Sequence, residues 1–362
     1  MFDRRLIINI DWILLGLTLV IAFFGLMAIY SAAGGDGENT YFKQIFWLGF
    51  GLVGLIIVIS VDYTTIAKSS YFIYALAIAT LVAVELSGKT VSGAQRWLSL
   101  GPLSLQPSEL TKLVIIITLA RYYSNSKTKQ PYRIYQLLIP GLLAALPCLL
   151  IIKQPDLGTA LIIVSLFLLL SFIAGINNRS LLILMLIGIT LLPFGWHHLK
   201  DYQKSRILIL LNPNTDTLGA GYHSLQSKIG VGSGGLLGKG FLAGTQSRLN
   251  FLPEKYTDFI FSVIGEELGF IGTTTLIILY LFLILRTFEV AIKAPDKLGT
   301  LIAAGVSGMF GLHIFFNIGM AIGLLPIVGL PLPFMSYGGS SMLTNLMGIG
   351  LLLNIRMRRF LH

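Results

Sequence analysis

Charged residues are scarce in this sequence. They make up 12% of its 362 residues, against about a quarter of a typical soluble domain. Hydrophobic residues make up 55% of the chain, and the mean hydropathy is +0.81. This number of charged residues is too small to cover the surface of a soluble fold of this length. The composition therefore excludes a chain of soluble domains. The apolar residues suffice for roughly ten membrane spans of about 20 residues each.

Several other signals are absent. The single cysteine, Cys148, has no partner, so an intrachain disulfide is excluded. No HExxH spacing occurs, and Gly238-Lys239 is followed by glycine, not by the Ser or Thr of a Walker A motif. Gly230–Gly235 matches GxGxxG by letter, but no strand pattern precedes it. We interpret these glycines as allowing tight turns and close approach of the backbone to a ligand or another helix, with loop flexibility as the alternative.

The apolar residues fall into ten runs, which predict an all-α polytopic integral membrane protein with one domain over 1–362. The run after Arg4 and Arg5 is followed by many others, which favours an uncleaved first helix over a signal peptide. The fourth run is short and follows Pro107, which is typical of a tilted or partly buried segment. The runs lie near residues 13–29, 44–61, 70–86, 109–122, 135–152, 157–175, 180–198, 259–285, 299–323 and 339–355.

The net charge of +10 carries information about orientation. Basic residues gather at alternate connections between the runs, which predicts that both termini are cytoplasmic. The loop 199–257, between the seventh and eighth runs, is then extracytoplasmic and holds seven more basic residues. Fourteen basic residues mark the cytoplasmic side: Arg4, Arg5, Lys68, Arg121, Lys127, Lys129, Arg133, Arg179, Arg286, Lys293, Lys297, Arg356, Arg358 and Arg359.

Acidic residues at the start of the eighth run are candidates for chemistry. Asp258 follows Thr257, a good helix N-cap, and precedes the apolar run. A carboxylate in a first helical turn is stabilised as an anion and is ready to accept a proton, although capping alone is the alternative. Glu266 and Glu267 lie about 12 Å further along such a helix. At that depth they must face the protein interior or a wet cavity.

Other polar residues gather at the connections predicted to be extracytoplasmic. Glu109 and Lys112 share one helix face, either as a mutual ion pair or facing a ligand. Arg96 beside Trp97 fits an interfacial anchor or a phosphate clamp. Asp156 has a turn cap as its simplest reading.

The long loop is basic, with Lys239, Arg248 and Lys255 among its cations. Its stretch 222–229 has the spacing of a short amphipathic helix in the interface plane. These cations either hold a phosphate-bearing lipid or are solvated. Two function classes remain: an enzyme acting on a membrane-embedded substrate at the outer leaflet, or a transporter. The polar groups gather on one side of the predicted membrane, the extracytoplasmic side, and no internal repeat is clear. Both observations favour the enzyme.

Four stretches together resemble the SEDS family (shape, elongation, division and sporulation proteins), and the long central stretch is similar to its elongation members. The stretches are GAQRWLSLGPLSLQPSEL, KQPDLGTA, the run from GAGYHSLQSKIG through GKGFLAGTQS and NFLPEKYTDFIF to GEELG, and PLPFMSYGGSSML. The resemblance covers nearly the whole chain.

The resemblance implies a peptidoglycan glycosyltransferase of the bacterial cytoplasmic membrane that polymerises lipid II into β-1,4 glycan strands with inversion. It implies Asp258 as the general base for the acceptor hydroxyl. Cations would stabilise the undecaprenyl pyrophosphate leaving group, and other acids would orient them or hold a divalent cation, Mg or Mn. The expected substrate-binding residues are Arg96, Lys112, Lys239, Arg248, Lys255, Glu109 and Asp156.

The resemblance also implies partners: a class B penicillin-binding transpeptidase, other elongation-complex membrane proteins and membrane lipids, and no nucleic acid. An apolar stripe on the eighth or ninth span is the expected docking surface for the transpeptidase. The alternative function, from another class, is a lipid II flippase.

Overall fold

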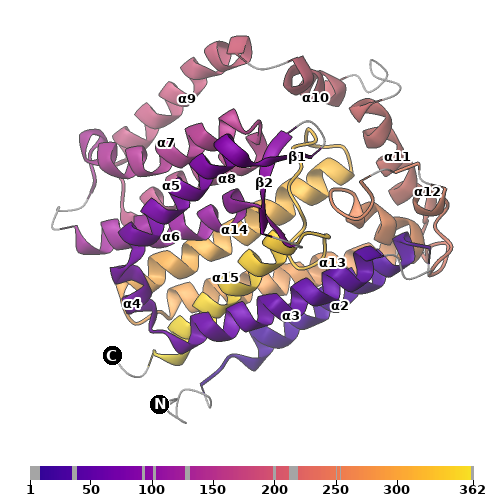
Figure 1. Ribbon diagram of the computed structural model, residues 1–362, viewed down its shortest axis with the longest axis horizontal. Helices are drawn as coiled ribbons and strands as arrows, with labels where there is room; N and C mark the ends of the chain where they lie inside the picture. The colour runs from indigo at the N-terminus through magenta and orange to yellow at the C-terminus, as the bar shows by residue number, and fades with distance from the viewer. Residues whose placement is uncertain are drawn as a thin grey trace.

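The computed structural model describes residues 9–34, 39–91, 94–100, 103–126, 131–198, 201–211, 219–249, 251–252 and 254–359 (Figure 1). The ten predicted apolar runs each overlap one long helix: α2 (Trp12–Ala32), α3 (Asn39–Ser60), α5 (Ser70–Ser87), α6 (Pro107–Asn125), α7 (Leu138–Lys153), α8 (Leu157–Ala174), α9 (Asn178–His198), α13 (Ile260–Ile292), α14 (Lys297–Ala321) and α15 (Gly339–Met357). The shorter helices are α4 (Tyr63–Lys68), η1 (Ile134–Leu137), α10 (Asp201–Leu211), α11 (Ala220–Ser233) and α12 (Thr245–Arg248).

In the described chain, seven helices are long and apolar enough to cross a membrane: α2, α3, α5, η1 with α7, α8, α13 and α14. The chain is therefore a multi-pass, mainly helical membrane protein, and the count of ten spans stays a prediction. An ion pair of 2.6 Å between Arg356 and Asp11 joins the start of α2 to the end of α15. Both ends of the described chain thus lie at the same end of the bundle.

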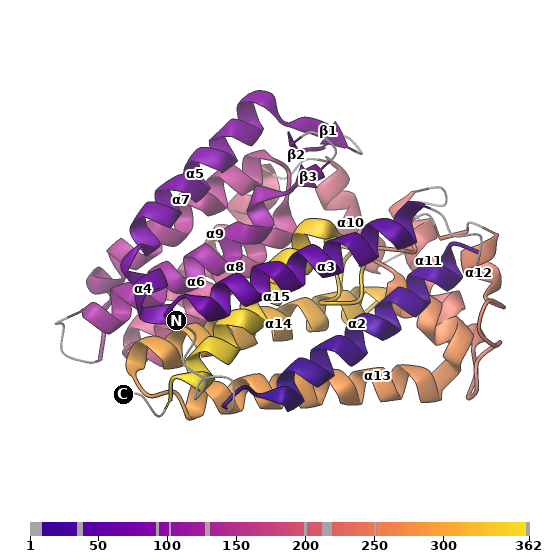
Figure 2. The ribbon, with the colours of Figure 1, turned by 60° about the horizontal axis from the view of Figure 1, so that its bottom comes forward.

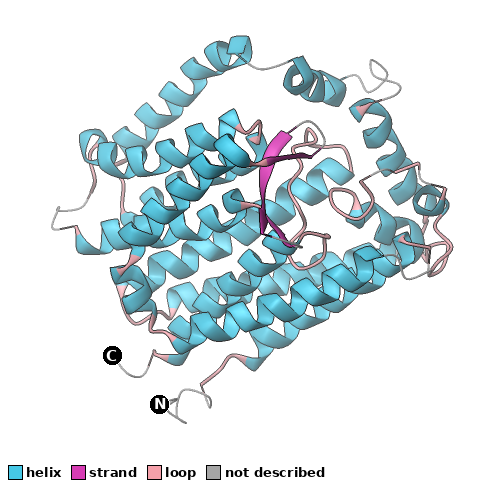
Figure 3. Ribbon diagram, in the orientation of Figure 1, coloured by secondary structure: helices cyan, strands magenta, loops and turns pink. Residues whose placement is uncertain are grey.

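A small antiparallel sheet was not predicted. It consists of β1 (Lys89–Val91), β2 (Ala94–Leu100) and β3 (Leu103–Leu105), in that order. It lies between α5 and α6 and is the magenta element of Figure 3. Lys89 pairs with Trp97, and Leu98 pairs with Leu105. The sheet gives the connection that carries Arg96 a fixed backbone.

Helix α6 lies inside the bundle. It begins with Pro107 at its first turn, where the missing N–H costs no hydrogen bond. It packs against α5, α8, α14 and α15, and most of its side chains are buried. Figure 2 shows α6 among the other helices, whereas α9 lies at the edge of the bundle in Figure 1. The prediction of a partly buried fourth segment is confirmed.

Helix α13 is broken at Gly269, whose φ of 63° and ψ of −156° leave the helical region. The glycine-rich segment after α11 lies against this break. The N–H groups of Lys239 and Gly240 donate to the carbonyls of Glu266 and Glu267, both at 3.0 Å. On the other side of the break, the N–H of Phe270 donates to the carbonyl of Gly235 at 2.8 Å. The segment therefore satisfies the backbone groups that the break leaves open.

One glycine within the stretch that matches GxGxxG, Gly234, lies against the backbone of α13. A Cβ on Gly234 would come closer than 3.0 Å to the carbonyl of Gly265. Two backbones can approach this closely only where side chains are absent. The interpretation of the glycines as sites of close backbone approach to another helix is confirmed for Gly234 and Gly238, whereas Gly232 and Gly235 have nothing within 4 Å of a Cβ position.

Gly238→Ala should lower the free energy of unfolding by about 2–4 kcal/mol, because the new methyl group meets the Glu267 carbonyl and φ is +80°. Gly232→Ala is the matched control, since that glycine lies in α11 with nothing within 4 Å of its Cβ position. Thermal unfolding of the purified protein in detergent measures both. Equal melting temperatures for the two variants would contradict the close packing at the break.

Candidate functional site

The segment between α14 and α15, residues 322–338, organises one end of the bundle. Prolines at 326, 331 and 333 prevent it from forming regular structure. Its carbonyl groups are instead bound by side chains from other elements, as buried backbone groups require. The donors are Arg206 to Ile327 O, Asn317 to Leu330 O, Tyr280 to Pro333 O and Gln44 to Ser336 O, and a His313 ring nitrogen lies 3.1 Å from Pro331 O.

Asp258 lies beside this segment. Helix α13 begins at Ile260 with Phe259 as its N-cap, so Asp258 precedes the helix. The prediction of Thr257 as a helix cap is wrong, because its hydroxyl bonds the Glu254 carboxylate at 3.0 Å. A Cβ added to Gly329 would lie 3.6 Å from Asp258 Oδ2, so the carboxyl group sits over a residue without a side chain.

The charge environment of Asp258 differs from the sequence expectation. Burial is the main cause that raises the pKa of Asp258 to about 6, and the negative charge of Glu254 raises this pKa further. Arg206 and Arg96 lower the pKa, and Asp156 raises it by a smaller amount. A helix N-terminus was expected to stabilise the anion, and that expectation is wrong in sign. A carboxyl group with a pKa near 6 is a stronger base than an ordinary one, and about 90% of it is ionised at pH 7.

Arg96 and Asp156 form the next part of the site. The Arg96 Nε donates to the carbonyl of Gln154 at 3.0 Å, and its guanidinium also donates to Pro155 O. Its Nη1 lies 3.9 Å from Asp156, which is buried. Asp156 caps α8 through Thr159, so its predicted capping role is confirmed, and it also accepts a hydrogen bond of 3.2 Å from Gln106.

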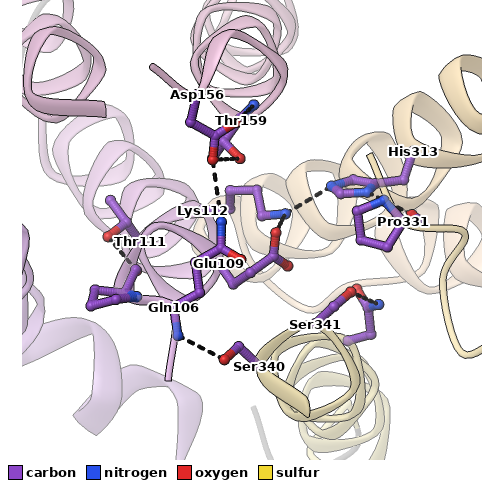
Figure 4. A network of polar contacts seen from close by, with 12 residues as sticks. Gln106, Glu109, Thr111, Lys112, Asp156, Thr159, His313, Pro331, Ser340 and Ser341 are labelled. Atoms are coloured by element: carbon purple, nitrogen blue, oxygen red, sulfur yellow. Dashed lines mark hydrogen bonds and ion pairs between the residues drawn. The ribbon is translucent and has the colours of Figure 1, made fainter. Parts of the chain in front are cut away.

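The deepest part of the site is a buried charged cluster on α6 and α14 (Figure 4). The Lys112 ammonium lies 2.8 Å from Glu109 Oε1 and 2.9 Å from His313 Nε2. Lys112 is 1% exposed and Glu109 4%. The ion pair between Glu109 and Lys112 is confirmed. Within the described chain, Glu109 Oε2 has no hydrogen-bond partner, so the cluster keeps an acceptor for a ligand or a water.

Two of the long-loop cations that were expected to bind substrate contact other groups of the protein. Lys239 pairs with Glu266 at 2.7 Å, and Glu266 also accepts the backbone N–H groups of Thr245 and Gln246. Lys255 is buried, with its ammonium 5.1 Å from the centre of the Tyr256 ring. The side chain of Arg248 lies outside the described residues.

Two further expectations have structural outcomes. Glu267 is buried and accepts a hydrogen bond from Ser31, so the prediction that Glu266 and Glu267 face the protein interior is confirmed. The amphipathic stretch 222–229 lies in helix α11, which packs on α13 and α14.

The sequence interpretation missed Arg206, His313, Asn317 and Gln106. His313 and Asn317 lie in a predicted membrane span, where polar side chains are costly and therefore mark a site. That rule alone was enough to single them out. Arg206 was counted only as one cation of the long loop, and nothing in the sequence shows that it meets the α14–α15 segment.

A divalent cation was a possible cofactor. Among the described residues, there is no group of three or more His, Cys, Asp or Glu side chains that could hold a metal ion. Asp156 is bound to Thr159, Gln106 and Arg96, and Glu109 to Lys112. These residues do not form a metal site as they are arranged here.

A family profile described as "Cell cycle protein", which covers FtsW, RodA and SpoVE, matches residues 6–360. The peptidoglycan glycosyltransferase MrdB of Escherichia coli is 38% identical over 353 residues, which are 97% of this chain and 95% of MrdB. The peptidoglycan glycosyltransferase RodA of Treponema pallidum is 33% identical, with 97% of this chain and 98% of that protein covered.

Solved structures agree with these matches. A chain from a peptidoglycan synthase complex, described for its structural coordination of polymerization and crosslinking, superposes with a TM-score of 0.84 at 34% identity. That match covers 98% of this chain and 99% of the other. The rod shape determining protein RodA of Thermus thermophilus superposes with a TM-score of 0.74 at 29% identity, over 97% and 98% of the two chains.

Proposed function

This chain belongs to the cell cycle protein family of FtsW, RodA and SpoVE, and from that premise we propose that it polymerises lipid II into glycan strands with Asp258 as the general base. It is a peptidoglycan glycosyltransferase, as its full-length relatives are. The observation that supports the catalytic part is the Asp258 carboxyl group, with its pKa raised to about 6 beside two arginines.

The reaction needs one base. The 4-hydroxyl oxygen of the acceptor sugar attacks the anomeric carbon of the donor, and its proton passes to the Asp258 carboxylate. The bond between the anomeric carbon and the pyrophosphate oxygen breaks, and its electron pair leaves with the pyrophosphate. A single displacement inverts an α-linked donor to a β-1,4 linkage. A second carboxylic acid, as in a glycosidase, is not needed, because the leaving group is already a weak base.

The leaving group needs positive charge. Arg96 and Arg206 both lower the pKa of Asp258, and Arg206 also donates to Ile327 O in the segment beside Asp258. We propose that these two arginines bind the pyrophosphate and stabilise the charge that develops on it. Lys112 is the next candidate, deeper in the site and held by Glu109 and His313. Lys239, Lys255 and Arg248 remain candidates for contacts with the rest of the lipid-linked substrate. We assign no step to a metal ion, because the described residues contain no group of three or more His, Cys, Asp or Glu side chains that could hold one.

Topology and partners belong to the same proposal. The basic residues at alternate connections support cytoplasmic termini and a site at the outer leaflet. The similarity to a chain of a peptidoglycan synthase complex supports a penicillin-binding transpeptidase as partner. Exposed apolar side chains on α13, such as Ile278, Leu281 and Phe282, offer a surface for its membrane helix.

The alternative is lipid II transport without polymerisation. The Asp258 carboxyl group favours the enzyme, because a carboxyl group with a pKa near 6 suits proton transfer.

Purified protein in liposomes with labelled lipid II on both leaflets should form glycan polymer, seen on a gel as a ladder that muramidase digests. A class B penicillin-binding transpeptidase is added in a parallel reaction, since a partner can be needed for activity. Movement of label between leaflets with no polymer under either condition would support the transporter instead. Empty liposomes and heat-inactivated protein are the controls.

A further inference from the structure

Three consecutive carbonyl groups at the catalytic aspartate are bound by residues more than fifty positions away. Tyr256 O accepts the N–H of Tyr337 at 2.8 Å, and Thr257 O accepts the Ser336 hydroxyl at 2.6 Å. Asp258 O accepts the Asn317 side-chain amide at 3.2 Å. These residues precede α13, so the helix does not fix their backbone.

Asn317 is fully buried, with an exposed fraction of 0%. Its Nδ2 donates both to Asp258 O and to Leu330 O, the latter at 2.8 Å. The opposite orientation of the amide would point its oxygen at two carbonyl oxygens, so these contacts define the orientation. Within the described chain, Oδ1 has no partner. A buried amide oxygen without a partner costs about 1–3 kcal/mol, and the two bonds that Nδ2 donates offset this cost.

Ser336 makes an equivalent link one residue earlier. Its hydroxyl donates to Thr257 O and accepts the backbone N–H of Leu332 at 2.8 Å. Gln44 of α3 donates to the Ser336 carbonyl at 3.2 Å, which anchors this serine to a third element. Helix α14 and the 322–338 segment therefore jointly hold the backbone of Thr257 and Asp258.

We propose that Asn317 and Ser336 are positioning residues that hold the Asp258 carboxylate in reach of the acceptor hydroxyl. The proposal rests on the proposed function, since it assumes that Asp258 acts as the base. Neither side chain touches the substrate in this role. The carboxylate must accept the proton while the acceptor oxygen attacks, so its position must be accurate. A misplacement of about 1 Å can reduce a rate about 100-fold.

The test measures polymerisation of lipid II by Asn317→Ala and Ser336→Ala under the conditions where the wild type is active. Each variant should lower kcat by about 10- to 100-fold with KM for lipid II changed less than about twofold, because substrate contacts are intact. The double variant should lose less than the product of the two single losses, because both act on the same backbone.

Asn354→Ala is the matched control. Asn354 is also 0% exposed and also donates to two backbone carbonyls, those of Val58 and Val61, near the end of α15. It should lower the melting temperature as Asn317→Ala does, yet leave kcat within about twofold of the wild type.

Two results overturn the inference. One is a loss of kcat in Asn317→Ala and Ser336→Ala no larger than in Asn354→Ala. The other is a rise in KM with kcat unchanged, which indicates a direct substrate contact. If Asn317→Ala does not fold, Ser336→Ala alone decides, because it removes only one hydroxyl. A wild type that forms no polymer with or without a transpeptidase contradicts the proposed function instead.

Discussion

Asp258→Asn should reduce glycan polymerisation by about 100- to 10,000-fold, the usual contribution of a positioned general base. The amide has the shape of the carboxyl group but cannot accept the proton of the acceptor hydroxyl. Polymer formed from purified lipid II, with a transpeptidase present if the wild type needs one, measures the loss. Activity within tenfold of the wild type would show that another group takes the proton.

The pH dependence of the wild type provides an independent check on the same residue. The base must be ionised, and the pKa of Asp258 is about 6. The rate of polymerisation should therefore be constant above about pH 7 and fall about tenfold per unit below pH 6. The small residual rate of Asp258→Asn should lack this acidic decline. An acidic decline in the variant as well would assign the titration to a different residue.

The melting temperature of Asp258→Asn serves as the folding control, and the direction of its change can be predicted. Because the pKa of Asp258 is raised in the folded protein above its usual 3.8, the fold favours the protonated carboxyl group. Its contribution to stability is therefore greatest below pH 4 and decreases as the pH rises from 4 towards 6. Asp258→Asn removes a partly buried charge, so at pH 7 its melting temperature should equal or exceed that of the wild type. A lower melting temperature would mean that the lost activity reflects unfolding.

Local sequence patterns were enough to predict the helices. Each run of apolar residues overlaps one long helix, because burial and membrane spans both require contiguous apolar segments. The spacing of three residues placed Glu109 and Lys112 on one helix face and offered an ion pair or a ligand-facing role, and the ion pair is present. The interpretation of the glycine-rich stretch as close backbone contact was also correct for Gly234 and Gly238, because only glycine allows it there.

Contacts between distant residues could not be predicted in the same way. Asn317 meets Asp258, and Arg206 meets Ile327, through a fold that brings four elements together. Threonine is often a helix cap, which is why Thr257 was predicted to be one. Its hydroxyl bonds Glu254 instead, and the helix begins later. The sign of the Asp258 pKa shift depended on burial. The sequence does not show how deeply a residue at the end of a predicted membrane span is buried.

Lys112→Met should lower the free energy of unfolding by about 3–5 kcal/mol, because it leaves Glu109 as a buried charge without its partner. Lys112 is 1% exposed and its ammonium is 2.8 Å from Glu109. Lys153→Met is the matched control, since Lys153 pairs with Glu85 at 3.5 Å with both side chains exposed. That change should cost less than about 1 kcal/mol. Melting temperatures in detergent compare the two; equal shifts would contradict the buried charge pair.

The double variant Lys112→Met with Glu109→Leu separates stability from function. Removing both charges together leaves no unpaired carboxylate, so most of the lost stability should return. Polymerisation should stay far below the wild type, because we propose that Lys112 also contributes positive charge to the pyrophosphate. The free Oε2 of Glu109 and the position of His313 beside Lys112 favour a cluster kept for more than stability. A double variant with normal stability and normal polymerisation would show that the pair serves the fold alone, and Arg96 and Arg206 would then be left to bind the leaving group.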